Sequence, residues 1–265
     1  MKYKGFYRNH QMRVRRALVF LTYLLCCLGC SHTSPPDQRQ LADQFYENLL
    51  IAFEAQNYSL VKNGLQKINE AGIADQRTLY LEGMVALIEK KPEKATSALN
   101  AALAIDPEYA EAHNTLGSIF MQQKRFMEAE TEFIEACNNR FYQTPEKAYH
   151  NLGNLYRLQG KNKQALGCYH KATEINSDYF PSHYELSSLY CSLSKFELAA
   201  KEAEKARQIS PGHPGVWLQI GKIEKALQKT PQAIEAFKQV IKLQPSGSFA
   251  ERASKELSLL TEPRK

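Results

Sequence analysis

Small residues recur at a nearly constant interval along most of this 265-residue chain. They form two series, which are Gly83, Gly117, Gly153, Ser187 and Gly221, and then Ala95, Ala129, Ala165, Ala199 and Ala233. Successive members of each series are 34, 36, 34 and 34 residues apart. An interval of this length is typical of arrays in which each repeat is a pair of helices that buries its apolar face against its neighbours.

The segment from Glu146 to Asn176 shows the pattern in full and resembles one tetratricopeptide repeat. The matching positions are Tyr149, Leu152, Gly153, Tyr156, Ala165, Tyr169 and Ala172. The small residues among them let two helices approach closely, and the large ones fill the space around the contact. Because one helix pair cannot bury its apolar face alone, the pattern predicts copies on both sides.

The spacing predicts a tetratricopeptide domain over residues 41–261, with about six helix pairs that start near residues 42, 76, 110, 146, 180 and 214. The first repeat is degenerate, as terminal repeats commonly are, and places Leu49, Val61, Leu65 and Ile68 at the motif positions. Pro107, Pro211 and Pro245 are expected to end second helices, and the segment from Ser248 to Leu260 to form a capping helix. No stretch shows sustained alternation of period 2, so the expected class is all-α, a right-handed superhelical solenoid.

The N-terminal segment has a different layout. Three arginines within residues 13–16 precede an apolar run over residues 17–29. This run is too short to span a bilayer and is typical of a secretory signal. We therefore expect residues 1–29 to be a signal peptide, and the start is left open between Met1 and Met12.

The apolar run ends at Gly29-Cys30-Ser31, which resembles the lipobox of bacterial lipoproteins. Cys30 is therefore the expected lipidation site, and residues 30–40 the lipidated terminus and linker that tether the domain to a membrane. Ser31, in place of Asp, resembles lipoproteins sorted to the outer membrane of double-membraned bacteria, which predicts a location there facing the periplasm. An ordinary signal peptide and an uncleaved signal anchor are the alternatives.

The net charge of +6 does not indicate a nucleic-acid partner. Its excess comes from Lys2, Lys4, Arg8, Arg13, Arg15 and Arg16. No basic stripe with interleaved aromatic residues remains in the rest of the chain.

The repeat region shows no motif of a catalytic, cofactor or metal site. It has no H-E-x-x-H, no glycine-rich phosphate loop and no G-x-S-x-G. The histidines His113, His150, His170, His183 and His213 are dispersed over several repeats and are expected on helix surfaces. The cysteines Cys137, Cys168 and Cys191 lie one to a repeat, which does not suggest a disulfide framework or a zinc site. We expect no enzyme activity, cofactor, metal or small-molecule substrate.

Helical periodicity identifies side chains that should line the concave groove of the solenoid. In the first three repeats they are Tyr46, Leu50, Phe53, Tyr80, Met84, Leu87, Asn114, Ser118 and Met121, and in the later repeats His150, Asn154, Arg157, Tyr184, Ser188 and Lys222. The first half is apolar and suits an amphipathic helix or an extended apolar peptide of a protein partner. Alternatively, Leu50, Phe53 and Leu87 belong to the core of an irregular first repeat. The Lys and Asn pattern by which some tetratricopeptide domains hold a terminal carboxylate is absent, since His150 replaces its first Lys.

A lipidated, exported chain of about six such repeats is similar to the type IV pilus biogenesis and stability lipoproteins, the pilotin family called PilF, PilW or Tgl. The 36-residue step makes this resemblance more specific. The step comes from the segment from Cys137 to Gly153, which has an aromatic residue, then Pro-Glu, then Asn-Leu-Gly, and resembles that family's corresponding loop. The resemblance implies a non-enzymatic adaptor that binds the pilus secretin and promotes its outer-membrane localisation and multimerisation. The alternatives are a scaffold of another envelope machinery, such as cell-wall or polysaccharide export, and a helper subunit of a periplasmic enzyme complex.

Overall fold

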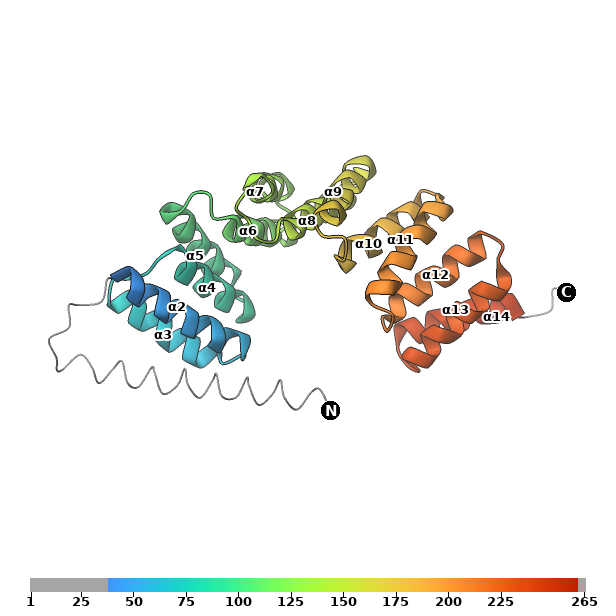
Figure 1. Cartoon of the computed structure of the whole chain (residues 1–265), viewed down its shortest axis with the longest axis horizontal. Coiled ribbons are helices and arrows are strands. Elements are labelled where there is room, and N and C mark those ends of the chain that lie inside the picture. The colour runs from blue at the N-terminus through green and yellow to red at the C-terminus, as the bar shows by residue number, and fades with distance from the viewer. Residues whose placement is uncertain (1–37, 262–265) are drawn as a thin grey trace. The chain divides into compact units, whose positions relative to one another are not determined.

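The structure, a computed structural model, describes residues 38–261. The expected signal peptide, Cys30 and the linker as far as residue 37 lie outside this range. Within it the chain forms 13 α-helices and no strand (Figure 1). The helices are α2 (Gln38–Glu54), α3 (Tyr58–Glu70), α4 (Gln76–Ile88), α5 (Pro92–Ile105), α6 (Ala110–Gln122), α7 (Phe126–Asn138), α8 (Pro145–Leu158), α9 (Asn162–Ile175), α10 (Phe180–Ser192), α11 (Phe196–Ile209), α12 (Pro214–Ala226), α13 (Thr230–Leu243) and α14 (Ser248–Thr261).

The helices follow one another as successive pairs, from α2 and α3 to α12 and α13, and α14 caps the last pair. The predicted all-α tetratricopeptide fold is confirmed. The first helix starts at Gln38, three residues before the expected domain boundary at residue 41. Among the described residues, no helix combines the length and apolarity that crossing a bilayer requires.

Prolines mark several helix boundaries. Pro145 and Pro214 open α8 and α12, because the first turn of a helix has no use for their missing N–H. Pro107, Pro211 and Pro245 each follow the end of a second helix after one residue. A proline at that place prevents the helix from continuing.

A residue with positive φ closes the turn inside every helix pair. These residues are Gln56, Lys90, Lys124, Gly160, Ser194 and Gln228, and their φ values lie between 57° and 72°. Only one of them is glycine, although this left-handed region is unfavourable for residues with a Cβ. The shared conformation shows that packing of the helix pair, rather than the identity of the turn residue, imposes this turn.

Contacts divide the chain into two compact units, one up to Ile119 and one from Phe120 onwards. We call them the N-terminal and the C-terminal unit. The boundary falls inside α6, and each unit is described separately.

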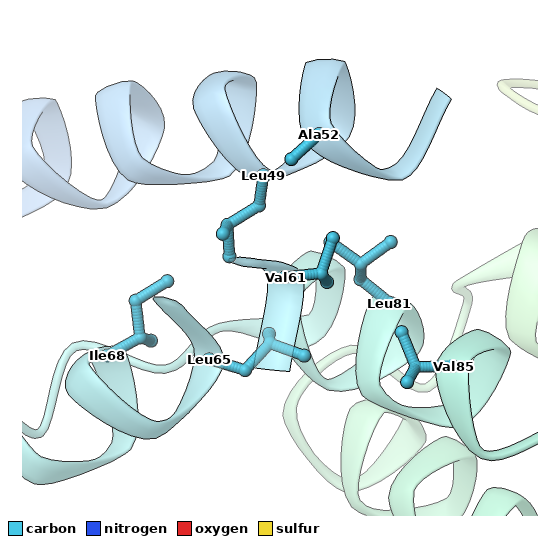
Figure 2. Packing of buried hydrophobic residues seen from close by; sticks show 7 residues of the cluster. All are labelled: Leu49, Ala52, Val61, Leu65, Ile68, Leu81 and Val85. Atoms are coloured by element: carbon cyan, nitrogen blue, oxygen red, sulfur yellow. The ribbon is translucent and has the colours of Figure 1, made fainter. Parts of the chain in front are cut away.

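One buried core cluster of the N-terminal unit joins three helices (Figure 2). Leu49 and Ala52 of α2 point toward Val61, Leu65 and Ile68 of α3 and toward Leu81 and Val85 of α4. Gly64 brings α3 close to α2, since a Cβ on it would lie 2.3 Å from Leu49 Cδ2. The degenerate first repeat therefore buries its larger residues by the same close approach of helices.

A glycine facing a ring recurs in the C-terminal unit. A Cβ on Gly153 would lie 2.6 Å from Tyr169 Cε1, and one on Gly221 would lie 2.5 Å from Phe237 Cε1. In the pair between them, Ser187 replaces the glycine and donates a hydrogen bond to the carbonyl oxygen of Ala199 at 2.8 Å. In that pair the buried Ala203 occupies the position that Tyr169 and Phe237 hold in the other two pairs. The larger Ser187 on the first helix is therefore matched by a smaller residue on the second helix.

His183 links α10 to α11 through a buried polar contact. Its Nδ1 lies 2.7 Å from Glu202 Oε2, and its Nε2 lies 2.9 Å from the carbonyl oxygen of Ser177. The residue is only 6% exposed, so the expectation of a helix-surface histidine is wrong here. Because both partners are acceptors, both ring nitrogens carry a hydrogen in this arrangement.

We expect Gly153→Ala to lower the free energy of unfolding. The new methyl group would collide with the ring of Tyr169, which is fully buried and whose hydroxyl donates to Asn154 Oδ1 at 2.7 Å. Overpacking of this kind typically costs about 1–3 kcal/mol. The matched control is Gly167→Ala in α9, where a Cβ meets nothing within 4 Å, so higher helix propensity should stabilise the protein by about 0.5–1 kcal/mol. Urea denaturation midpoints that shift in the same direction for both variants would contradict this packing.

We also expect the stabilisation by His183 to decline as the pH rises above its ordinary pKa of 6.5. Burial alone lowers the pKa of His183, but its hydrogen bonds with Glu202 and Ser177 raise it, and the net direction is upward. Since the folded-state pKa exceeds the unfolded one, the stabilisation is complete below the unfolded pKa and is lost as the pH passes the folded pKa. The urea midpoint difference between wild type and His183→Gln should therefore shrink as the pH is raised from below 6.5 into the alkaline range. A difference independent of pH would show that His183 is not held as a cation.

Candidate functional site

The expected groove residues fall in both compact units. Tyr46, Leu50 and Phe53 lie on α2, Tyr80, Met84 and Leu87 on α4, and Asn114 and Ser118 on α6, all in the N-terminal unit. Met121, Asn154 and Arg157 lie in the C-terminal unit. The two sets are therefore described as separate surfaces.

Equivalent positions on α2 and α4 carry the apolar set of the N-terminal unit. Leu50 and Met84 are one repeat apart, as are Tyr46 and Tyr80, so each pair occupies the same helix face. Leu50, Met84 and Leu87 are half-buried and are not members of the buried core cluster. These three residues, bordered by Tyr46 and Tyr80, are called the apolar surface below.

Phe53 has a different role from its expected one. It packs partly buried against the core cluster, and its ring lies edge-on to Tyr58 with centroids 5.7 Å apart. For this residue the alternative interpretation, packing inside an irregular first repeat, describes the structure. Its position just before the turn at Gln56 explains why its side chain reaches α3.

Charged residues at one edge of the apolar surface are paired with one another. The guanidinium of Arg77 lies 4.8 Å from the ring centroid of Tyr46, and its Nη2 lies 2.6 Å from both Asp43 Oδ1 and Asp75 Oδ2. Burial raises the pKa of the Tyr46 hydroxyl. The phenol of Tyr46 at this edge therefore stays neutral, and the charge of Arg77 is compensated by Asp43 and Asp75.

Aromatic residues in the loops pack on the first helices in a way that the sequence reasoning missed. Ring centroids are 5.5 Å apart for Tyr80 and Tyr109, 5.6 Å for His150 and Tyr179, and 5.7 Å for Tyr184 and His213. In each pair the second residue comes 29 positions later and precedes or opens the next first helix. Tyr80 is therefore a packing residue as well as a groove candidate. The constant offset of 29 between ring-bearing residues is the signal that could have revealed these contacts.

Asn154 is engaged within the C-terminal unit. Its Nδ2 donates to Nε2 of His150 at 3.0 Å, and its Oδ1 accepts from the hydroxyl of Tyr169 at 2.7 Å. His150 Nδ1 lies 3.1 Å from Ser182 Oγ. Burial, and then the charge of Arg157, lower the pKa of His150 to about 4, which keeps the imidazole neutral at pH 7. This network leaves Asn154 one amide hydrogen for any ligand.

Arg157 and Met121 are more accessible to a partner. Arg157 is exposed, and its Nε lies 3.5 Å from Glu185 Oε2. Met121 is half-buried near the end of α6.

Two other histidines also depart from the expected plain surface position. His170 Nε2 lies 2.7 Å from the hydroxyl of Tyr190, and His213 packs beside Phe180 with ring centroids 5.1 Å apart. The three cysteines are half-buried free thiols. Burial raises the pKa of Cys137 to about 12 and that of Cys168 to about 11, which makes both poor nucleophiles near neutral pH. No group of three His, Cys, Asp or Glu side chains within residues 38–261 is arranged to hold a metal ion.

Comparison with protein families gives three matches to the tetratricopeptide repeat, over residues 86–136, 146–179 and 214–246. These segments lie within the helix pairs described above. They support the assignment of the fold in both units.

The similarity to two relatives covers very different shares of those proteins. The chain is 24% identical to BBSome complex member bbs-4 of Caenorhabditis elegans over 57% of its own length, and it spans only 33% of that protein. It is 26% identical to the type IV pilus assembly protein PilF of Pseudomonas aeruginosa over 67% of its length, and it spans 73% of that protein. The similarity to PilF therefore extends over most of both chains.

Solved structures show the same fold. The structure of Pseudomonas aeruginosa PilF matches with a TM-score of 0.75 and 20% identity, covering 83% of this chain and 99% of PilF. PilW, described as a widely conserved type IV pilus biogenesis factor, matches with a TM-score of 0.72 and 20% identity, covering 82% of this chain and 99% of PilW. Taken together, these matches show that the chain is a tetratricopeptide-repeat protein that is similar to PilF and PilW over most of its length.

Proposed function

We propose that this protein is a non-enzymatic adaptor in type IV pilus biogenesis that holds an apolar segment of a protein partner on its apolar surface. One observation carries this proposal: Leu50, Met84 and Leu87 occupy repeated positions on α2 and α4 but are left out of the buried core. The relationship to PilF, whose name places it in pilus assembly, supports the biological setting.

The chemistry of the apolar surface suits an amphipathic helix. Met84 and Leu87 come one helical turn apart and can fit the irregular side chains of a partner helix, since methionine adapts its shape readily. The hydroxyl group of Tyr46 borders this apolar strip and can hydrogen-bond to the polar edge of such a helix. A partner helix with apolar residues at i, i+3, i+4 and i+7 would pack these residues on the apolar strip and turn its polar side to the bordering hydroxyl.

We propose the pilus secretin as the partner and the periplasmic side of the outer membrane as the location. The Arg-rich start, the apolar run and Cys30 support a lipid anchor there. An adaptor tethered in this way would bring secretin subunits together at the membrane in which they assemble. It would need no cofactor and no bound small molecule.

Met84→Glu combined with Leu87→Glu is expected to weaken secretin capture at least about thirtyfold, because a carboxylate would be buried unpaired against an apolar ligand. The measurement is the amount of secretin, identified by mass spectrometry, that co-purifies from detergent extracts. Dissociation-resistant secretin multimers should decline in parallel.

The matched control is Leu158→Glu, which makes the same change on α8 at a leucine that is 61% exposed. It should leave capture unchanged. We avoid Tyr80→Ala as a test because it would also remove the packing of Tyr109. Normal capture by a folded double variant would reject the apolar surface as the binding site.

Cys30→Ala is expected to give an exported protein without a lipid. Metabolic labelling with a radioactive fatty acid should mark the wild-type protein and leave the variant unmarked. Cys27→Ala is the control, since it removes a nearby cysteine that is not the expected acceptor. Undiminished labelling of the Cys30 variant would rule out this anchor.

A further inference from the structure

We propose that the surface formed by α10, α12 and α14 binds a carboxylate of an acidic segment in a partner protein. The site is centred on Gly215, and its polar members are Tyr184, His213, Gln219, Lys222 and Arg252. It lies in the C-terminal unit and is chemically opposite to the apolar surface of the N-terminal unit. The inference goes beyond the proposed function and does not depend on it.

Two polar groups converge at Gly215. The hydroxyl oxygen of Tyr184 and Nδ1 of His213 lie 3.1 Å and 3.2 Å from the position that a Cβ on Gly215 would take. Because glycine has no Cβ, no atom of α12 occupies this position between the two polar atoms. Among the described residues, no hydrogen-bond partner is found for the buried His213 Nδ1.

Gln219 adds a second unpaired group one helical turn further along α12. Its Nε2 is buried and has no hydrogen-bond partner among residues 38–261. A buried donor without an acceptor is unfavourable, so such a group favours a ligand that supplies the acceptor. The residue as a whole is half-buried, and its terminal amide turns about a soft torsion, so the amide can reach a ligand at the surface.

The spacing places these groups in one row. Gly215, Gln219 and Lys222 follow at intervals of four and three residues, so they share one face of α12. At the start of this row Tyr184 of α10 approaches Gly215, and at its end the charge of Lys222 acts on the thiol of Cys191, also on α10. The row therefore runs beside α10 for two helical turns, a length that suits an extended peptide.

The uncompensated charge at this surface is positive. Lys222 and Arg252 are exposed, and in the part of the chain that the structure describes neither has an ion-pair partner. Burial and Glu185 raise the pKa of the Tyr184 hydroxyl, and the positive charge of Arg252 opposes this shift.

Two carboxylates on the neighbouring helices are already paired. Glu185 lies 3.5 Å from Arg157 Nε, and Glu256 of α14 lies 2.6 Å from Lys225 Nζ. An incoming carboxylate would therefore meet the donors of Tyr184 and Gln219 between two free cations. Hydrogen bonds to an ionised acceptor are stronger than those between neutral groups.

The size of the charged set favours a peptide over a nucleic acid. Binding to a phosphate backbone relies on several cations that follow successive phosphates. Here two free cations flank a short row of neutral donors, which matches one or two carboxylates spaced along a peptide.

The test uses the full-length protein and a fluorescein-labelled, amidated octapeptide of alternating Glu and Gly. Fluorescence anisotropy should show saturable binding that weakens as salt is added. The same peptide with Gln in place of Glu should bind at least about tenfold more weakly. Lys222→Gln with Arg252→Gln should reduce the affinity about tenfold, because both free cations are lost. Lys238→Gln with Lys242→Gln on α13, which removes the same charge from exposed positions, should not.

A glycine pair tests the geometry without changing the charge. Gly215→Ala would place a methyl group between Tyr184 and His213 and should weaken binding, whereas Gly212→Ala, where a Cβ meets nothing within 4 Å, should not. Thermal melts of both variants establish that they are folded. The Met84→Glu, Leu87→Glu protein should bind the peptide normally, which separates this site from the apolar surface.

Four results would each overturn the inference. They are the absence of saturable binding to the wild-type protein, equal affinity for the Glu and Gln peptides, an equal loss in the two charge-removal variants, and tighter binding of an eight-nucleotide oligothymidylate than of the Glu peptide. The last result would assign the surface to nucleic acid.

Discussion

The structure depends on one recurring contact, in which a residue without a side chain on a first helix lies against a large side chain of the second helix. Gly83 meets Leu99, Gly153 meets Tyr169 and Gly221 meets Phe237. Each contact sets the distance between two helices and buries a large apolar group at the same time. Because neighbouring pairs bury their remaining apolar faces against each other, an error in one such contact spreads to the adjacent repeats.

The same contact explains two features that look unfavourable in isolation. Residues such as Lys90 and Gln228 adopt positive φ in the turns, and the packed helix pair holds them there despite their Cβ atoms. Ser187 occupies a glycine position, and its hydroxyl, which would otherwise be a buried unpaired group, donates to the carbonyl oxygen of Ala199. Local strain and polar burial are thus compensated by contacts within each pair.

Packing also engages some side chains on the first helices in contacts within the protein and leaves others available to a partner. Tyr80, His150 and Tyr184 each support a loop ring, and Asn154 is bound by His150 and Tyr169. Leu50, Met84 and Leu87 remain outside the core cluster in the N-terminal unit. Among the described residues of the C-terminal unit, His213 Nδ1 and Gln219 Nε2 have no hydrogen-bond partner. The two units therefore offer chemically different surfaces.

The sequence by itself determined the repeat, the helix pairs and the relation to pilus proteins. Small residues every 34 or 36 positions specify close helix contacts, and such contacts depend on side-chain size, which a sequence displays directly. It also indicated the apolar character of Leu50, Met84 and Leu87, because helical period assigns residues to a face. Only the tertiary structure decided which groove candidates are free, since that depends on neighbours distant in sequence. Phe53 turns to Tyr58, His183 is buried between Glu202 and Ser177, and Gln219 Nε2 has no hydrogen-bond partner among residues 38–261.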